Sequence, residues 1–180
     1  MQPRQQSWPR IWLMTDERMG DRLWKAVDRL PGGAGIVLRH YSIPKEARAG
    51  LANRLSTIAK ERGMTLAIAA DVELARTVGA PLVHNPTEAA GDLSFSRSVH
   101  SVAQAEAARR EGAALLFVSP VFSTRSHPET EPLGSELAAT IAKAAGVTAI
   151  ALGGMNAQNF AALESAGFYG WAGIDAWLRT

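Results

Sequence analysis

The residues of this sequence best suited to chemistry are its four histidines, each of which follows an apolar run at a short distance. They are His40, His84, His100 and His127. Because the pKa of an imidazole lies near neutrality, a histidine can both take and return a proton in acid–base catalysis. One such histidine is more often a hydrogen-bonded structural residue, but four in equivalent positions indicate a polar pocket where the apolar runs end.

A candidate anion site accompanies these histidines. Arg39 follows the second apolar run and can make a bidentate, charge-assisted contact with a phosphate. Gly153 and Gly154 precede a predicted helix over 156–166, where glycine lets backbone N–H groups approach an anion at the start of a helix. A glycine pair can also serve the geometry of a turn alone, so this signal depends on its place in the fold.

Eight strand-length apolar runs precede these positions, at 11–14, 35–38, 65–69, 81–83, 93–97, 114–118, 148–152 and 170–174. Continuous hydrophobicity is typical of strands buried on both faces of a parallel sheet. The intervening segments predict helices, including 47–62, 102–110, 135–145 and 156–166. We therefore expect an α/β fold, a compact (β/α)8 TIM-type barrel, with an open doubly wound sheet as the alternative.

Two parts of this barrel are expected to be incomplete. The link at 85–92 is too short and too rich in small residues for a full helix, and the chain ends at Thr180, so the last helix is truncated. We expect a flexible segment over 1–10 and one barrel domain over 11–180. A partner subunit could cover the short last segment around Trp177, which leaves a homo-oligomer open.

In a parallel barrel the active site lies at the carboxyl ends of the strands, and phosphate often binds after strands 7 and 8. Polar residues and glycines at those ends therefore define the candidate site. His100 is the candidate catalytic residue. The candidate substrate-binding residues are Arg39, His40, His84, Ser98, Ser119, Thr124, Ser126, His127, Gly153, Gly154, Gly173 and Ile174.

Composition narrows the class of protein. The 180 residues are 47% hydrophobic and carry a net charge of only +2 with both signs interspersed, so nucleic acid is not an expected partner. The chain has no cysteine and thus neither a disulfide nor a thiolate metal site. The first ten residues lack the apolar core of a secretory signal, and no apolar run is long enough to span a bilayer. We expect a cytoplasmic protein without a membrane partner.

An ordered series of motifs from about residue 11 to 177 resembles the thiamine phosphate synthase/TenI superfamily. The series reads LMTD at 13–16, VLR at 37–39, VELA at 72–75, VH at 83–84, SVHS at 98–101, SPVFST at 119–124, AIALGGM at 149–155 and GWA at 170–172. The resemblance implies a small phosphorylated heterocycle as ligand. Synthases of this superfamily join a pyrimidine pyrophosphate to a thiazole phosphate with Mg²⁺, whereas TenI proteins shift a proton on a phosphorylated thiazole carboxylate.

The sequence departs from the synthase pattern where the metal and pyrophosphate ligands are expected. Synthases typically read Arg-Glu-Lys, Asn-Asp-Arg, Gly-Gln-Asp and Thr-x-Thr-Lys after strands two, three, four and six. This chain reads RHY at 39–41, AAD at 69–71, NPT at 85–87 and TRSH at 124–127. Mg²⁺ usually needs one or two carboxylates, so we expect no cofactor, and Mg²⁺ only if the synthase alternative holds. Asp71 is the one nearby carboxylate that could compensate.

The resemblance to TenI centres on His100, which matches the catalytic histidine of the TenI segment. A further departure is Asp175, where the superfamily usually has a serine beside the phosphate. The first hypothesis is a TenI-like thiazole tautomerase without a metal. The alternatives are a divergent Mg²⁺-dependent thiamine phosphate synthase, a non-catalytic thiazole or thiamine phosphate-binding protein, and a zinc site built from the four histidines.

Overall fold

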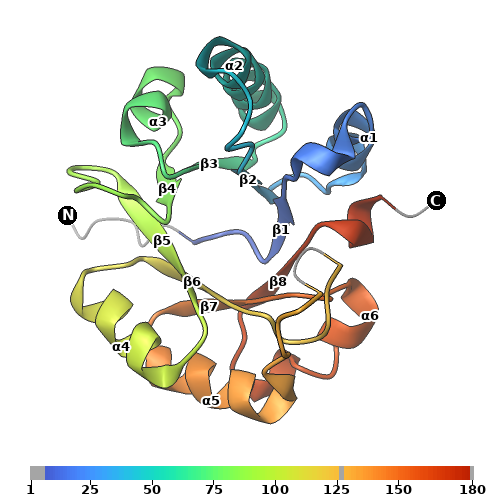
Figure 1. Ribbon diagram of the computed structural model, residues 1–180, viewed down its shortest axis with the longest axis vertical. Coiled ribbons are helices and arrows are strands. Elements are labelled where there is room, and N and C mark those ends of the chain that lie inside the picture. Colours follow the sequence, from blue (N-terminus) through green and yellow to red (C-terminus); the bar gives the residue numbers. More distant parts are fainter. Residues whose placement is uncertain (1–6, 126–127, 179–180) are drawn as a thin grey trace.

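The computed structural model describes residues 7–125 and 128–178, which form a closed barrel of eight parallel strands (Figure 1). Each strand pairs with the next in sequence, and the last pairs with the first, Trp12 lying opposite Ala172. The predicted (β/α)8 barrel is confirmed, and its closure rules out the open sheet. The strands are β1 (Ile11–Met14), β2 (Gly35–Leu38), β3 (Thr65–Ala69), β4 (Leu82–His84), β5 (Ser94–Val99), β6 (Leu115–Val118), β7 (Thr148–Leu152) and β8 (Gly170–Gly173).

The helices surround the barrel and bury their apolar faces against the strands (Figure 1). No helix joins β4 to β5, as expected, since residues 85–93 are all described and none is helical. The α-helices are α1 (Arg22–Arg29), α2 (Lys45–Glu61), α3 (Val72–Val78), α4 (Val102–Arg110), α5 (Gly134–Ala145) and α6 (Ala157–Phe160). The 3₁₀ turns are η1 (Glu17–Met19), η2 (Glu164–Ala166) and η3 (Asp175–Trp177).

The helix predicted over 156–166 is much shorter than expected. Asn156 caps α6, which ends at Phe160, and the chain then continues through tight turns. Leu163 N–H bonds to Phe160 O at 2.8 Å and Ala166 N–H bonds to Leu163 O at 2.9 Å. These are the three-residue steps of a 3₁₀ helix, so the α-helical ladder is lost at this point.

The seam where β8 meets β1 is covered by η3 in place of a full eighth helix. The indole of Trp177 stacks on that of Trp171, with ring centroids 5.2 Å apart and planes 3° apart. Its Nε1–H donates to Trp12 O at 3.3 Å. The truncated last element therefore still closes the outer layer over the seam with aromatic surface.

The chain before β1 is attached to the barrel. Residues 1–6 of the predicted flexible segment lie outside the described residues. Trp8 is buried against the barrel interior, and Pro9 O accepts a hydrogen bond from Trp12 Nε1 at 2.7 Å. Arg10 O accepts from Trp171 N at 2.8 Å, so the pairing of β1 with β8 extends through Arg10.

The barrel interior is filled by large inward side chains rather than left open. The rings of Trp12 and Phe117 are fully buried and meet edge to face at 5.5 Å. Gly35 makes room for the indole, because a Cβ on Gly35 would lie 2.1 Å from Trp12 Cε3. Packing of the barrel interior therefore requires a glycine at position 35.

We expect Gly35→Ala to lower the free energy of unfolding by about 1–3 kcal/mol, because the added methyl overpacks a rigid, fully buried indole. Gly50→Ala is the matched control, since Gly50 lies within α2 and its Cβ would meet nothing within 4 Å. Alanine in a helix interior should raise the free energy of unfolding by about 0.5–1 kcal/mol. Urea unfolding monitored by tryptophan fluorescence would measure both, and equal effects of the two changes would contradict the packing argument.

Candidate functional site

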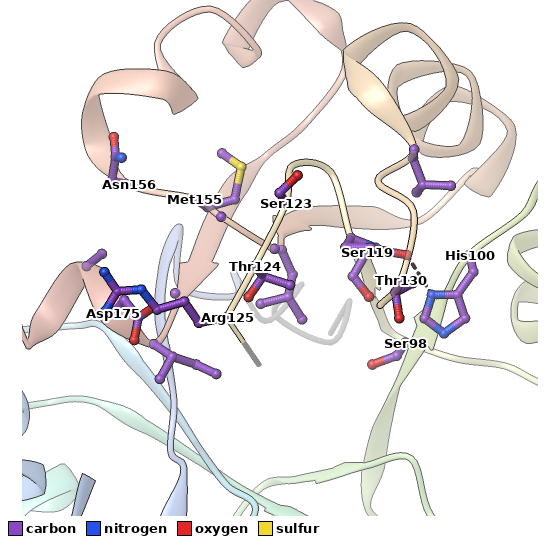
Figure 2. Close-up of a pocket in the computed structure, with 18 of the residues that line it drawn as sticks. Ser98, His100, Ser119, Ser123, Thr124, Arg125, Thr130, Met155, Asn156 and Asp175 are labelled. Atoms are coloured by element: carbon purple, nitrogen blue, oxygen red, sulfur yellow. Dashed lines mark hydrogen bonds between the residues drawn. The ribbon is translucent and has the colours of Figure 1, made fainter. Parts of the chain in front are cut away.

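A pocket of about 850 Å³ lies at the carboxyl ends of the strands. Its walls come from the segments that follow β2, β4, β6, β7 and β8 and from the end of β5. Figure 2 shows Ser98 and His100 at one side, facing a wall made by the loop after β6. The pocket is therefore where barrel geometry predicts an active site.

His100 stands just beyond β5 and lines the pocket. Its Nδ1 lies 2.6 Å from Ser119 O (Figure 2). A carbonyl oxygen only accepts, so Nδ1 carries a proton and Nε2 is the nitrogen left to face a ligand. The backbone N–H of His100 donates to Gln104 Oε1 at 2.7 Å, which fixes the residue at the start of α4. Within the described part of the chain, no residue bonds to Nε2 of this imidazole.

His84, the last residue of β4, lines the floor of the pocket. Its ring meets Phe117 edge to face at 5.1 Å, and its Nδ1 lies 3.0 Å from Ser96 Oγ. Burial, with the positive charges of Arg39 and Arg97, lowers the pKa of His84 to about 3. This imidazole is therefore neutral at physiological pH.

His40 does not line the pocket. It is buried, and its Nδ1 lies 3.0 Å from Thr15 Oγ1, which also accepts the backbone N–H of Arg39 at 3.0 Å. The Thr15 hydroxyl is thus shared by two residues that follow β2, and burial lowers the pKa of His40. The expected role of His40 in ligand binding has no support in this geometry, because its side chain is hydrogen-bonded to Thr15, which follows β1.

Arg39 lines the pocket but is held from behind. Its Nε–H donates to Thr15 O at 2.9 Å and an Nη2–H donates to Asp16 Oδ2 at 3.2 Å. Asp16 also accepts from Arg18, through Nε–H and Nη2–H at 2.8 Å each. The hydrogen bond from Arg18 is the main reason that the pKa of Asp16 falls from 3.8 to about 2, against the opposing effect of partial burial. The guanidinium of Arg39 is thereby oriented, and part of its charge is offset.

Gly153 and Gly154 line the pocket and are required by close packing of two loops. A Cβ on Gly153 would lie 2.7 Å from Pro120 Cα, and one on Gly154 would lie 2.6 Å from Ser123 O. Both residues also have positive φ values, 97° and 64°. The helix that follows is too short to offer a substantial dipole, and the backbone N–H of Asn156 is already bonded within its capping box. Loop packing and backbone conformation therefore explain why both residues are glycine, without any bound anion.

Asp175 opens η3 and lines the pocket beside Gly173 and Ile174. It also lines a smaller neighbouring pocket of about 350 Å³, together with Arg18 and Arg125. Figure 2 shows Arg125 and Asp175 on the same side of the main pocket. Arg39, which could have offset this carboxylate, is instead paired with Asp16. The β8 end of the pocket therefore carries a negative charge close to arginines.

The structure offers little for a metal ion. Among the residues it describes, no three His, Cys, Asp or Glu side chains gather as a metal site. Asp71 caps α3 by accepting from Leu74 N at 2.8 Å and pairs with Arg48 at 3.1 Å, so it does not compensate for the missing carboxylates. His40, His84 and His100 do not form the proposed zinc site, and His127 lies outside the described residues. The residues present at the expected positions do not fit the Mg²⁺ of a synthase.

The structure brings most of the predicted site together. Ser98, Ser119, Thr124, Gly173 and Ile174 line the pocket with the residues described above. Ser126 and His127 lie outside the described residues. Thr130, Glu131 and Gln158 also line the pocket without having been predicted, as do Tyr41 and Asn85, which the sequence places just after the second and fourth strands. For Asn85 a signal existed, a polar residue directly after a strand, whereas Thr130 and Glu131 come from a long loop without any pattern.

None of the helices in the described ranges is both long and apolar enough to cross a membrane.

Comparisons with known proteins agree with the fold. A family model described as thiamine monophosphate synthase matches residues 11–177. A putative thiamine-phosphate synthase 2 of Aquifex aeolicus is 27% identical and covers 95% of this chain and 98% of its own. A thiamine-phosphate synthase of a Roseiflexus species is 29% identical over 92% of this chain and 77% of its own. The solved structure of a thiamine phosphate pyrophosphorylase from Pyrococcus furiosus superposes with a TM-score of 0.79 at 22% identity, covering 93% and 86% of the two chains.

We expect Asp16→Asn to lower the free energy of unfolding near neutral pH, because the carboxylate pairs with Arg18 and Arg39. Its native pKa of about 2 lies below the ordinary value of 3.8, so the carboxylate stabilises the native state above that value and loses this effect as pH falls. The difference between wild type and variant should thus shrink as pH falls from about 4 to about 2. Urea unfolding at a series of pH values would measure it.

The matched control is Asp92→Asn. This change removes an ion pair with Arg76, and the Asp92 side chain is 84% exposed. Exposed pairs contribute little, so its effect near neutral pH should be the smaller of the two. If the difference in free energy of unfolding between wild type and Asp16→Asn stays constant with pH, the assigned role of the Asp16 carboxylate is wrong.

Proposed function

The chain belongs to the thiamine monophosphate synthase family, and we propose that within it this protein catalyses a TenI-like proton shift on a small phosphorylated thiazole. His100 is the acid–base residue of this proposal. The family membership carries the general assignment to thiamine biosynthesis. The choice of reaction depends on the pocket of this particular chain.

The observation that carries the proposal is the orientation of His100. Ser119 O holds a proton on Nδ1, so Nε2 is the nitrogen of this pocket-lining ring that can take up a proton and return it. A tautomerisation needs one group that removes a proton at one atom and returns it at another, which an oriented imidazole can do. Neither His84 nor His40 is suited to this task, because burial lowers the pKa of each.

The rest of the pocket supports a small polar ligand. Its volume of about 850 Å³ exceeds what one thiazole phosphate occupies, and hydroxyls of Ser98, Ser119 and Thr124 line it. Arg39 and Arg125 add positive charge on the β2 and β6 sides. These groups can bind a phosphate and a carboxylate, whereas Asp175 disfavours an anion directly beside it.

The second candidate is a thiamine phosphate synthase, which the names of the relatives favour. In that reaction a bound Mg²⁺ would neutralise the pyrophosphate of the pyrimidine substrate. The carboxylates that line the pocket among the described residues are Glu131 and Asp175, on the loops after β6 and β8. Neither of them follows β2, β3 or β4, where the synthase pattern places its acidic residues, and we therefore give the metal-independent reaction priority. A protein that binds the same phosphates without turnover is the remaining alternative.

We expect His100→Asn to lower kcat for thiazole tautomerisation by about 100- to 10,000-fold, the usual contribution of general acid–base catalysis. The asparagine amide can still donate to Ser119 O but has no basic nitrogen in place of Nε2. The KM should change little, since the fold and the pocket hydroxyls remain. Proton exchange on the substrate, followed by NMR without added metal, would measure the rate.

The same preparation should be assayed for thiamine phosphate formation from the two phosphorylated precursors, with Mg²⁺ and with a chelator. Tautomerisation without Mg²⁺ and loss of it in His100→Asn would support the proposal. Synthesis that requires Mg²⁺ would replace it by the second candidate. Binding of both precursors with neither reaction would favour the non-catalytic alternative, and full activity of His100→Asn would remove His100 from the mechanism.

A further inference from the structure

We infer that Asn85 is a positioning residue that holds His84 in a single tautomer, with the proton on Nδ1 and the lone pair of Nε2 directed at the amide of Asn85. The tautomer of His84 follows from hydrogen bonds alone. Only the consequence, that His100 is the imidazole that exchanges protons with substrate, rests on the proposed function.

The backbone places Asn85 where its side chain can reach the floor of the pocket. It directly follows β4, and its N–H donates to Ser96 O at 2.8 Å, which continues the pairing of β4 with β5. Its φ of 46° lies in the left-handed region, which asparagine tolerates better than most residues. The turned backbone leaves the side chain lining the pocket beside His84 rather than on the outer face of the barrel.

The orientation of the Asn85 amide follows from one contact. The backbone N–H of Ser98 donates to Asn85 Oδ1 at 2.8 Å, so the oxygen of the amide must face Ser98. The amide nitrogen, Nδ2, then faces His84 Nε2 at 3.2 Å. An amide nitrogen only donates, and two donors cannot face each other, so Nε2 of His84 accepts.

The other nitrogen of His84 is fixed from the opposite side. Its Nδ1 lies 3.0 Å from Ser96 Oγ, which is fully buried. A proton on Nδ1 therefore has an acceptor that no water competes for. The charged groups that act on this imidazole are Arg39 after β2 and Arg97 in β5, both of them positive. They oppose protonation of His84, as does its burial against Phe117 of β6.

This arrangement determines what the floor of the pocket offers a ligand. Ser98 Oγ also lies 3.2 Å from His84 Nε2 and lines the pocket. The Ser98 hydroxyl can at most share the single lone pair of Nε2 with the Asn85 amide, and its own lone pairs remain for a donor on the ligand. Asn85 thus keeps His84 from acting as an acid, and the proton exchange is left to His100.

The test is Asn85→Asp in the whole protein, with ¹⁵N NMR of histidine-labelled samples and no ligand. In wild type, His84 should show a protonated Nδ1 and an unprotonated Nε2 at neutral pH. In the variant a carboxylate oxygen replaces the amide nitrogen, so the proton should move to Nε2 and the pKa of His84 should rise by about 1 to 3 units. Asn53→Asp, which adds the same charge on the exposed face of α2, should leave the His84 signals unchanged.

A second variant guards against misfolding of the first. Asn85→Gly keeps the left-handed backbone and removes the amide, so His84 should then populate both tautomers. Wild-type His84 with its proton on Nε2, or an unchanged tautomer in both variants, would overturn the assignment. Because these signals are read without substrate, they test Asn85 even if the proposed reaction is wrong. Where tautomerase activity is present, Asn85→Asp should lower its kcat/KM at least about 10-fold.

Discussion

The pairing of β8 with β1 is the constraint on which the rest of this structure depends. It closes eight parallel strands into a ring, so all their carboxyl ends converge on one face. The interior of this ring holds the Trp12 indole, and residue 35 must be a glycine because a Cβ there would overlap the indole. The closure also needs an outer cover, which the stacked Trp171 and Trp177 provide where a full helix is missing.

Within the pocket, two histidines from neighbouring strands have opposite properties because their surroundings differ. His84 lies under the pocket, between Phe117 and Ser96, where burial keeps it neutral. His100 lies at the exposed rim, held by a single carbonyl, that of Ser119. The same side chain is thus enclosed and neutral in one place and exposed to the pocket in the other.

Several charged groups around the site are paired with one another in the absence of a ligand. Arg39 and Arg18 both pair with Asp16. Arg48 pairs with Asp71, the carboxylate that the sequence offers as a possible Mg²⁺ ligand. These pairs fix the loops after β1, β2 and β3 without providing carboxylates for a cation. The glycine pair after β7 likewise satisfies loop packing first. The pocket of this family member is therefore lined by hydroxyls, imidazoles, Arg39 and Arg125, together with the carboxylates of Glu131 and Asp175.

The sequence by itself determined the barrel and the face that carries the site, because continuous apolar runs and the polar residues after them depend only on local order along the chain. Tertiary structure alone decided that His40 faces Thr15 instead of the pocket, and that Asn85 orients His84. A hydrogen bond between residues of different strands depends on their relative depth and register, to about an ångström, and no pattern in one segment contains that information.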